Sequence, residues 1–506
     1  MALTLVVLAV LAVALVALAV YDLVQRRHTV LRNYPVLGHL RYVLESFGPE
    51  IRQYLVTDND EERPFSRDQR RWIYSSAEAG DTSFGFGTDN HLESTRDYLI
   101  IDHAAFPLGL GGARPDPSSG VPAAKVLGAA RGRRGAFRPS LVNISGMSFG
   151  SLSAAAIESM NRGAGLVGCW HNTGEGGLSP HHLHGADLVW QMGTGYFGCR
   201  DEQGRFSLDR LTNALEQHPQ VRAVEIKLSQ GAKPGLGGLL PGAKVTPQIA
   251  AIRGIPVGVD CVSPPGHTAF HDVDSLLELV ETIAERTGRP VGVKSAVGEV
   301  GFWEQLAARS QDTGRAVDFI TIDGGEGGTG AGPLVFTDHV ALPFRQAFAR
   351  VYRIFAERSM QHDVVWIGSA KLGLPENALT ALAMGCDQVS VGREVMMATG
   401  CIQAQRCHTG RCPTGVATQS PWLQHGLDPA SKSVRVADYL AQLRFELVRL
   451  GRACGQLHPA LVPLSQIEVL DGSQAPAPLD RVLDYQPGWG LPCDRDAQAL
   501  RDLMAG

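Results

Sequence analysis

The sequence predicts an α/β fold: a (β/α)8 TIM barrel with an N-terminal transmembrane helix and with N- and C-terminal extensions. From Arg138 onward, short apolar β-branched runs alternate with amphipathic stretches, which is typical of parallel strands joined by crossover helices. Several later strands end in glycine-rich loops. Because these loops are spread along the chain, they favour a closed barrel over an open doubly wound sheet, which gathers its ligand loops at one switch point.

The composition limits the possible classes of protein. The chain has 506 residues, of which 44% are hydrophobic and 19% charged, so there is enough apolar material for a large core and intrinsic disorder is excluded. A net charge of −5 argues against nucleic acid as a partner. The nine cysteines are too few and odd in number for a secreted disulfide scaffold.

Residues 1–25 are predicted to form a transmembrane anchor. Residues 2–20 are an apolar run interrupted only by Thr4, and as a helix it would be about 28 Å long, which matches a bilayer. Arg26, Arg27 and His28 follow the run, so the positive-inside rule predicts a single-pass protein with its barrel in the cytoplasm. The alternative is a cleaved signal peptide, although a basic n-region and a small-residue cleavage site are missing.

The remaining chain is divided by its patterns into a connector or surface layer at residues 26–100, the barrel at 101–420 and a helical and irregular extension at 421–506. Strands are predicted at residues 141–146, 221–227, 255–260, 290–294, 318–323, 364–370 and 388–391. Apolar residues at helical spacing predict helices at residues 151–164, 273–287, 340–359, 376–385 and 436–450.

A glycine-rich segment, Gly-Gly-Glu-Gly-Gly-Thr-Gly-Ala, follows the predicted strand that ends at Asp323. Successive backbone N–H groups without a Cβ nearby can wrap a phosphate or the edge of a ring. The segment is neither a Walker loop nor the dinucleotide fingerprint, because its spacing fits neither motif. It therefore indicates an anion or cofactor cradle, with a plain tight turn as the alternative.

Two lysines, Lys227 and Lys294, stand at the ends of predicted strands. A lysine at the C-terminal end of a barrel strand points into the mouth of the site and can stabilise anionic charge on a ring or a substrate. Gln230, Lys233 and Arg253 add polar groups nearby in the sequence. An arginine is suited to bidentate binding of a carboxylate.

Three cysteines, Cys401, Cys407 and Cys412, lie close together and are followed by Pro413. Zinc sites use closely spaced pairs, which are missing here. Iron–sulfur clusters are held by thiolates on irregular loops. The three could hold a three-iron cluster, or a four-iron cluster with a fourth ligand from elsewhere; the alternative is three structural thiols.

A short histidine tract at positions 181, 182 and 184 lacks a carboxylate at helical spacing. We therefore predict a solvated loop there, without a metal site.

Taken together, these motifs resemble the FMN-binding synthase domain of glutamate synthase, over residues 141–419 and in the family's order. The matching segments are SGMSFGSLS (145–153), NTGEGG (172–177), KLSQGAKPGLGGLLPG (227–242), IDGGEGGTGA (322–331) and CIQAQRCHTGRCPTGVATQ (401–419). The last is the most specific, because the family holds a [3Fe–4S] cluster with this cysteine spacing. The resemblance implies a (β/α)8 barrel with FMN at the strand C-termini and metal ligands at Cys401, Cys407 and Cys412.

The resemblance also implies a role for individual residues. The flavin is expected against Ser145, Gly146 and Met147, with Asn172 and Thr173 alongside. Lys227, Gln230 and Lys294 are expected to face its ring. The phosphate is expected on Gly324, Gly325, Gly328, Thr329, Gly368, Ser369, Gly392 and Arg393. The substrate-contacting and catalytic positions are expected to be Glu175, Lys233, Arg253 and Lys294.

In the family, 2-oxoglutarate and ammonia form 2-iminoglutarate, which takes a hydride from reduced FMN to give glutamate. The resemblance thus implies an oxidoreductase acting on CH–NH2 donors. The sequence has neither the pattern of a pyridine-nucleotide domain nor that of a glutaminase. Without the first, we expect electrons from a ferredoxin or a separate reductase subunit. Ammonia or an amine is expected to come free or from a separate amidotransferase subunit.

One position departs from the family. Leu239 stands where the family uses a glutamine near the substrate. This departure keeps open a related FMN and iron–sulfur amine or amino-acid dehydrogenase, or an N-substituted glutamate synthase, coupled to a membrane electron chain. A non-catalytic assembly subunit that kept the scaffold is a further alternative.

Overall fold

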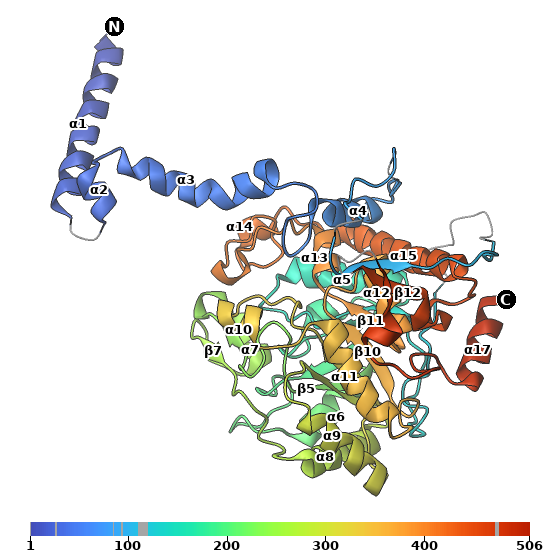
Figure 1. The fold of residues 1–506 in the computed structure, drawn as a ribbon. Coiled ribbons are helices and arrows are strands. Elements are labelled where there is room, and N and C mark those ends of the chain that lie inside the picture. The colour runs from blue at the N-terminus through green and yellow to red at the C-terminus, as the bar shows by residue number, and fades with distance from the viewer. Residues whose placement is uncertain are drawn as a thin grey trace. The chain divides into compact units, whose positions relative to one another are not determined.

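The computed structural model describes residues 2–25, 28–83, 85–92, 95–109, 120–470 and 475–505 (Figure 1). The chain forms two compact units, Met1–Arg70 and Arg71–Gly506, which are described separately.

The first unit is helical. It contains α1 (Ala2–Val24), α2 (Thr29–Asn33), α3 (Gly38–Ile51) and the π-helical turn η1 (Arg52–Val56); α4 (Arg67–Ala77) begins at its end. With 23 residues of mean hydropathy 3.1 over its central window, α1 is long and apolar enough to cross a membrane. A signal sequence would have the same length and composition, so both interpretations of this segment fit the helix.

The second unit is built around eight parallel strands that close into a barrel, which confirms the predicted fold class. Each strand pairs with its two neighbours around the ring, and β11 closes it on β2. Their order around the barrel is β2 (Val142–Ile144), β3 (Trp170–Asn172), β4 (Asp187–Met192), β5 (Val221–Lys227), β8 (Val291–Ser295), β9 (Phe319–Asp323), β10 (Val365–Ser369) and β11 (Gln388–Val391). Inward side chains from five of these strands, among them Trp170, Val189 and Phe319, pack into one buried core cluster.

Helices surround the barrel. They are α5 (Ala154–Leu166), α6 (Leu208–Gln217), α7 (Pro247–Arg253), α8 (Val273–Thr287), α9 (Gly301–Thr313), α10 (Leu334–His339), α11 (Phe344–Ala356), α12 (Pro375–Ala383) and α13 (Arg393–Thr399). In α8 the apolar face is buried, Asp272 and Ser275 form a capping box at the start, and Gly288 ends the helix with a φ of 73°.

One sequence prediction of an element was wrong, and another differs in its bounds. Residues 255–260 are not a barrel strand: Gly258 adopts a positive φ there, and the chain then enters β7 (Cys261–Val262), which pairs only with β6 (Leu239–Leu240) in a separate two-stranded sheet. The helix predicted over 340–359 is present with other bounds: α11 begins only after Pro343, which lacks the N–H that a helix interior requires, and it ends at Ala356.

Two barrel strands, β3 and β4, were not predicted from the sequence. The strand β3 is only three residues long and carries His171 and Asn172, so it lacks the apolar run that signals a strand. Both of these polar side chains are buried, and Asn172 donates to Glu225 on another strand, a partner that the local sequence does not reveal.

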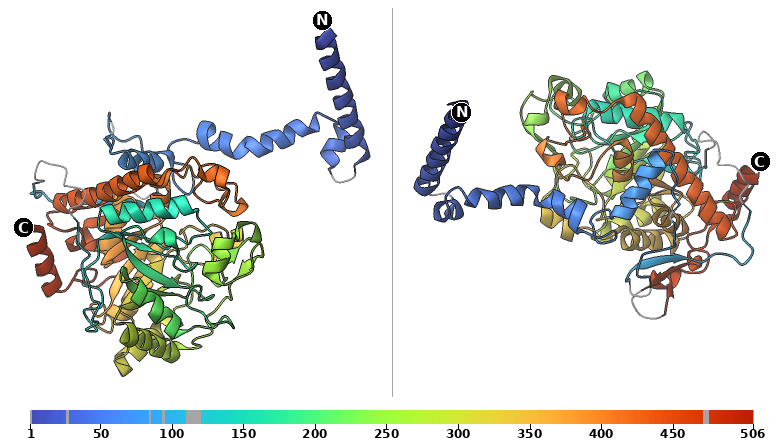
Figure 2. Two further views of the ribbon diagram at one scale, coloured as in Figure 1. Left: turned by 180° about the vertical axis from the view of Figure 1, so that it is seen from behind. Right: turned by 90° about the horizontal axis from the view of Figure 1, so that it is seen from above.

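The C-terminal residues form a layer on the barrel. They comprise α14 (Pro421–Gln424), α15 (Pro429–Ala453), β12 (Ile467–Leu470), β13 (Ala477–Pro478), α16 (Leu479–Val482) and α17 (Asp494–Ala505). The long helix α15 packs along α5, as both views of Figure 2 show, and a Cβ on Gly163 would lie 2.6 Å from Val436. The strand β12 pairs with β1 (Tyr98–Ile101), so residues on both sides of the barrel segment share one small sheet. The division into four segments by function stays a prediction.

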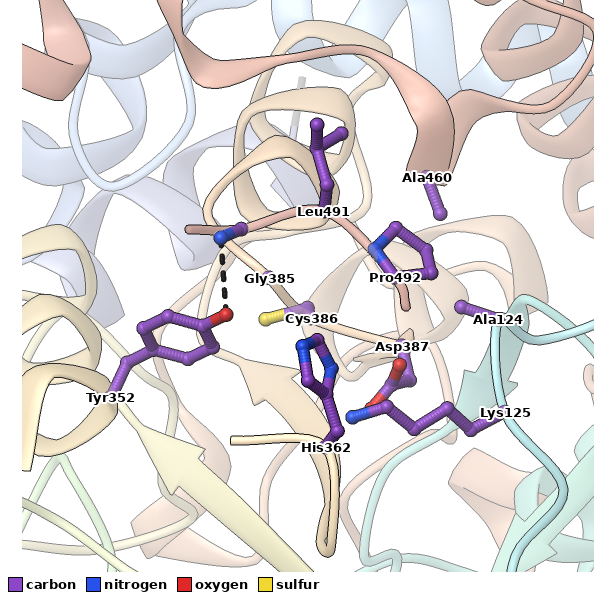
Figure 3. Close-up of a pocket in the computed structure, with 11 residues that line it drawn as sticks. Ala124, Lys125, Tyr352, His362, Gly385, Cys386, Asp387, Ala460, Leu491 and Pro492 are labelled. Atoms are coloured by element: carbon purple, nitrogen blue, oxygen red, sulfur yellow. Dashed lines mark hydrogen bonds and ion pairs between the residues drawn. The ribbon is translucent and has the colours of Figure 1, made fainter. Parts of the chain in front are cut away.

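The N-terminal ends of β10 and β11 surround a buried ion pair (Figure 3). Lys125 Nζ lies 3.2 Å from Asp387 Oδ2 and donates to the carbonyl oxygens of Gln361 and Val364 at 3.0 and 2.9 Å. Asp387 Oδ2 also accepts from the Trp366 N–H at 2.7 Å. A cavity of about 10 Å³ beside the pair is large enough for one water at most. This end of the barrel therefore has the features of a structural support.

The substitution Lys125→Met should lower the free energy of unfolding by about 3–5 kcal/mol, because it leaves the Asp387 carboxylate buried without its countercharge. Urea unfolding of the purified full chain measures the effect. The control is Arg205→Met, which breaks an exposed pair with Asp201 and should cost less than about 1 kcal/mol. Equal losses in the two variants would contradict the structural role of the buried pair.

Candidate active site

A buried carboxylate joins four strands near the C-terminal end of the barrel. Glu225 on β5 is only 3% exposed. Its Oε2 accepts from Asn172 Nδ2 at 2.8 Å and from Gln191 Nε2 at 2.7 Å, while its Oε1 accepts from Thr321 Oγ1 at 2.7 Å. A single side chain thus connects β3, β4, β5 and β9.

Lys294 lies beside this network, at the end of β8. Its Nζ is 3.3 Å from Asp323 Oδ2, and the side chain is buried. Burial opposes the charged form of Lys294, but the carboxylates of Asp323, Glu225 and Glu175 outweigh burial and raise its pKa above the ordinary value. Lys294 therefore carries a charged ammonium group at this strand end near neutral pH. Asp323 Oδ2 also accepts from the Gly231 N–H at 3.1 Å, which ties the β5 loop to β9.

A second group of charges lies around Glu175, in the loop after β3. Lys227 Nζ is 3.1 Å from Glu175 Oε1 and donates to Gln230 Oε1 at 3.2 Å. Burial disfavours ionisation of Glu175, but the positive charges of Lys227, Lys233 and Arg253 lower its pKa below the ordinary value. Burial lowers the pKa of Lys233. The like charge of Lys227 lowers it as well, whereas the negative charge of Glu175 raises it. The structure thus brings the predicted substrate-contacting residues together.

Arg253 reaches this group from the last position of α7, which ends there because Gly254 adopts a left-handed φ of 61°. Its Nη2 donates to the carbonyl oxygen of Phe149 at 3.2 Å, and its guanidinium carbon lies 5.0 Å from the centre of the Phe197 ring. Among the described residues, its buried Nε has no hydrogen-bond partner. A buried guanidinium with an unused donor is suited to an anionic ligand.

The loop after β2 lies against β3 and β4. The Met147 N–H donates to the Asn172 carbonyl oxygen at 3.0 Å, and the Ser145 N–H donates to that of Val391 at 2.9 Å. A Cβ on Gly146 would lie 3.0 Å from Gln191 Nε2, so a larger residue would push against the Gln191 amide. The Glu225 network therefore supports, through Asn172 and Gln191, the loop predicted to contact the flavin.

His182 corrects the prediction of a solvated histidine loop. Its side chain is fully buried, with Nε2 2.9 Å from the Met147 carbonyl oxygen and Nδ1 2.8 Å from Ser179 Oγ. Burial lowers its pKa to about 4, so the ring is neutral near pH 7. The prediction was wrong because the partner that holds this ring, Met147, is distant in the sequence.

Hydrogen bonds join the loop after β9 to the end of β10 and to the start of α13. The Gly324 N–H donates to the Ser369 carbonyl oxygen at 3.0 Å, and the Arg393 guanidinium donates to the Glu326 carbonyl oxygen. A Cβ on Gly328 would lie 2.6 Å from Arg393 Cδ, so a larger residue there would displace the Arg393 side chain. These segments contain all the residues predicted to hold a phosphate, with Gly368 and Ser369 at the end of β10 and Arg393 at the start of α13; that role itself stays a prediction. They are Gly324, Gly325, Gly328, Thr329, Gly368, Ser369, Gly392 and Arg393.

The three clustered cysteines follow α13 on an irregular loop that includes the 3-10 turn η4 (Cys407–Thr409). Burial, together with the neighbouring Cys407 and Cys412, raises the pKa of Cys401 to about 12. Lys244 Nζ donates to the Cys407 carbonyl oxygen at 2.8 Å and to that of Ala417 at 3.3 Å. The thiols therefore act on one another electrostatically. Within the described ranges, however, no three His, Cys, Asp or Glu side chains are grouped closely enough to hold a metal ion.

Sequence reasoning missed four polar residues of the site: Glu225, Gln191, Thr321 and Asp323. A signal for the first was present, because side chains two residues apart in a strand share a face and Glu225 therefore points to the same side as Lys227. The others become recognisable only when the barrel closes and brings their strands to Glu225 and Lys294.

Comparison with known proteins identifies the family. The profile described as "Conserved region in glutamate synthase" matches residues 138–456, more than half of the chain. The chain belongs to the glutamate synthase family. Its relatives include the glutamate synthase large subunit-like protein YerD of Bacillus subtilis, which is 36% identical over 85% of this chain and 88% of that protein.

In other members of the glutamate synthase family, the segment that aligns with this chain is a smaller part of the relative's length. The archaeal glutamate synthase [NADPH] of Methanocaldococcus jannaschii is 35% identical over 66% of this chain and 61% of that protein. The ferredoxin-dependent glutamate synthase of Pyropia yezoensis is 32% identical over 54% of this chain and 18% of its own. Among solved structures, a mandelate oxidase is 16% identical, with 80% of this chain and 98% of that chain covered and a TM-score of 0.42.

The stability of the barrel should fall between about pH 6.5 and pH 4. In this range the unfolded chain binds a proton at His182 that the folded chain excludes, which costs up to about 3 kcal/mol. His458, whose pKa burial also lowers to about 4, should contribute similarly. Urea unfolding at pH 7 and pH 4.5 should therefore show a smaller pH-dependent loss in His182→Gln than in the wild type. His271→Gln, which removes an 85% exposed ring, is the control, and identical losses in all three proteins would contradict the assignment.

Proposed function

We propose that this chain is a flavin-dependent oxidoreductase of the glutamate synthase type, which reductively aminates 2-oxoglutarate to glutamate through 2-iminoglutarate. The observation that carries the proposal is the group of Lys227, Lys233 and Arg253 around Glu175, beside the charged Lys294 at the strand ends. A dicarboxylic keto acid needs two cationic partners, and Arg253 and Lys233 are suited to that task.

The donor set of the site fits FMN. Glycine backbone around residues 324–328 and the Arg393 guanidinium would hold the phosphate, as loops after the last barrel strands commonly do. The ring would lie against Ser145, Gly146 and Met147, with Asn172 and Thr173 alongside. Bound FMN supplies hydride transfer. Lys294 would stabilise negative charge at the ring, because its neighbouring carboxylates keep its Nζ protonated.

The residues of this chain would bind and orient the substrate in complementary ways. Arg253 is fixed by its bond to the Phe149 carbonyl oxygen and its contact with Phe197, so its guanidinium presents a rigid fork to a carboxylate. Lys233, whose pKa burial lowers, holds the proton of its ammonium group less tightly than an exposed lysine does. Ionised Glu175 holds the Lys227 ammonium in place through their ion pair at 3.1 Å.

We also propose the partners of the enzyme. Although they are not grouped closely enough in this structure to hold a metal ion, Cys401, Cys407 and Cys412 would hold a [3Fe–4S] cluster, or a four-iron cluster with a further ligand. Electrons would arrive from a ferredoxin or a separate reductase subunit. Ammonia or an amine would be free or delivered by a separate amidotransferase subunit. The apolar helix α1 would anchor the chain, with the basic residues after it holding the barrel on the cytoplasmic side.

A second candidate keeps the cofactors and changes the substrate. Leu239, where the family uses a glutamine, is half-exposed and pairs across β6 and β7 with the exposed Val262. An apolar pair at this position favours an amine or amino-acid dehydrogenase, or an N-substituted glutamate synthase, coupled to a membrane electron chain.

Turnover tests the leading proposal. Purified full-length protein, supplied with reduced ferredoxin, 2-oxoglutarate and ammonium, should form glutamate, and Lys294→Met should lower the rate by about 100-fold or more because a preorganised charge is lost. Arg309→Met, on the outer helix α9, is the control for loss of a surface cation. Visible and electron-paramagnetic spectra of the same sample report flavin and cluster type. If neither ammonium nor methylamine gives an amino-acid product, the synthase assignment is wrong.

Leu239→Gln separates the two candidates. If 2-oxoglutarate is the substrate, the restored polar contact should lower the KM for 2-oxoglutarate by about tenfold, the effect of one hydrogen bond to a charged group, with little change in kcat. Steady-state kinetics of both proteins measure this change. Leu236→Gln, in the same loop and also exposed, is the matched control. A rise in KM, together with flavin reduction by amines in the wild type, would instead support the dehydrogenase.

A further inference from the structure

The helix α3 and the turn η1 that continues it carry an exposed apolar stripe. Its side chains are 40–78% exposed although they are apolar. The members are Leu40, Val43, Leu44, Phe47, Ile51 and Leu55. Their spacing of three or four residues places them on one face of a helix. Glu45, Arg41 and Arg52 lie on the opposite face, where Arg41 Nε and Glu45 Oε1 form an ion pair at 2.7 Å.

The start of α3 is held against the end of α1. The buried carboxylate of Asp22 accepts from the Val36 N–H at 2.9 Å, and both of its oxygens lie 3.0 Å from His39 Nε2. Leu31 is buried on the short helix α2 between α1 and α3, and a Cβ on Gly38 would lie 3.0 Å from its side chain. These contacts fix a tight corner, so α3 leaves the axis of α1 at a steep angle in Figures 1 and 2.

The position of this corner identifies what covers the stripe. The apolar run of α1 ends near Val24, so a bilayer crossed by α1 would have its surface at the corner where α3 begins. We propose that α3 and η1 lie along that bilayer surface, with the stripe among the lipid chains and the charged face toward water. The proposal rests on the proposed role of α1 as an anchor.

The chemistry of the segment agrees with a lipid surface as its partner. A helix with one apolar face and arginines on the other is typical of interfacial membrane helices, whose binding depends on buried apolar area and on attraction to anionic headgroups. Arg32, in the last turn of α2, adds positive charge at the corner. An isolated helix as short as α3 is marginal in water, so burying the stripe in lipid would also stabilise the helix itself.

Photocrosslinking in vesicles tests the proposal. The photoreactive residue p-benzoyl-phenylalanine is introduced at Phe47 on the stripe or, as the matched control, at Glu45 on the opposite face. Each full-length protein is reconstituted in phosphatidylethanolamine–phosphatidylglycerol vesicles, and mass spectrometry first shows whether α1 is retained. Irradiation should give at least about tenfold more lipid adduct from position 47 than from position 45. Ile51, one turn along, should behave like Phe47.

Each other outcome overturns the proposal. Crosslinks from position 47 to barrel peptides would show that the stripe is covered by this chain, and crosslinked dimers would show that a second copy covers it. Equal lipid labelling at both positions, or none, would show that α3 does not lie on the bilayer with this face. Loss of α1 from the purified protein would instead overturn the proposed role of α1 as a membrane anchor. The intact mass of the protein shows this result separately.

Discussion

The buried carboxylate of Glu225 is the contact on which the chemical end of the barrel depends. Three hydrogen bonds, from Asn172, Gln191 and Thr321, converge on its two oxygens inside the ring of strands. A buried carboxylate is stable only when hydrogen bonds reach its oxygens. The same bonds hold each donor side chain in place. Because Asn172 and Gln191 in turn contact the loop after β2, the position of that loop is set from the interior of the barrel.

Charge compensation extends from this network to the mouth of the barrel. Glu225, Asp323 and Glu175 together keep Lys294 protonated despite its burial. Cations around Glu175 keep that carboxyl ionised in the same way. Each group would be costly to bury alone, and the cost is offset because opposite charges face one another across neighbouring strands. The site is therefore preorganised to stabilise negative charge, which the proposed flavin and dicarboxylate chemistry requires.

The two ends of the barrel use buried charge differently. Near the N-terminal ends of the strands, Lys125 is saturated by Asp387 and two carbonyl oxygens, which leaves no donor for a ligand. Near the C-terminal ends, Arg253 retains a buried Nε without a partner among the described residues. This contrast agrees with the usual separation of stability and chemistry in barrels of this type.

The sequence by itself determined the α/β alternation, the closed barrel, the apolar first helix and the order of the glycine, lysine and cysteine motifs, because these depend on local periodicity and spacing. Only the tertiary structure decided which polar residues act together. Glu225, Gln191 and Thr321 are distant in the sequence and meet when the barrel closes, and His182 becomes a buried neutral ring only because Met147 offers its carbonyl oxygen. Burial and long-range partners, which set pKa values and hydrogen bonds, are not encoded in any local pattern.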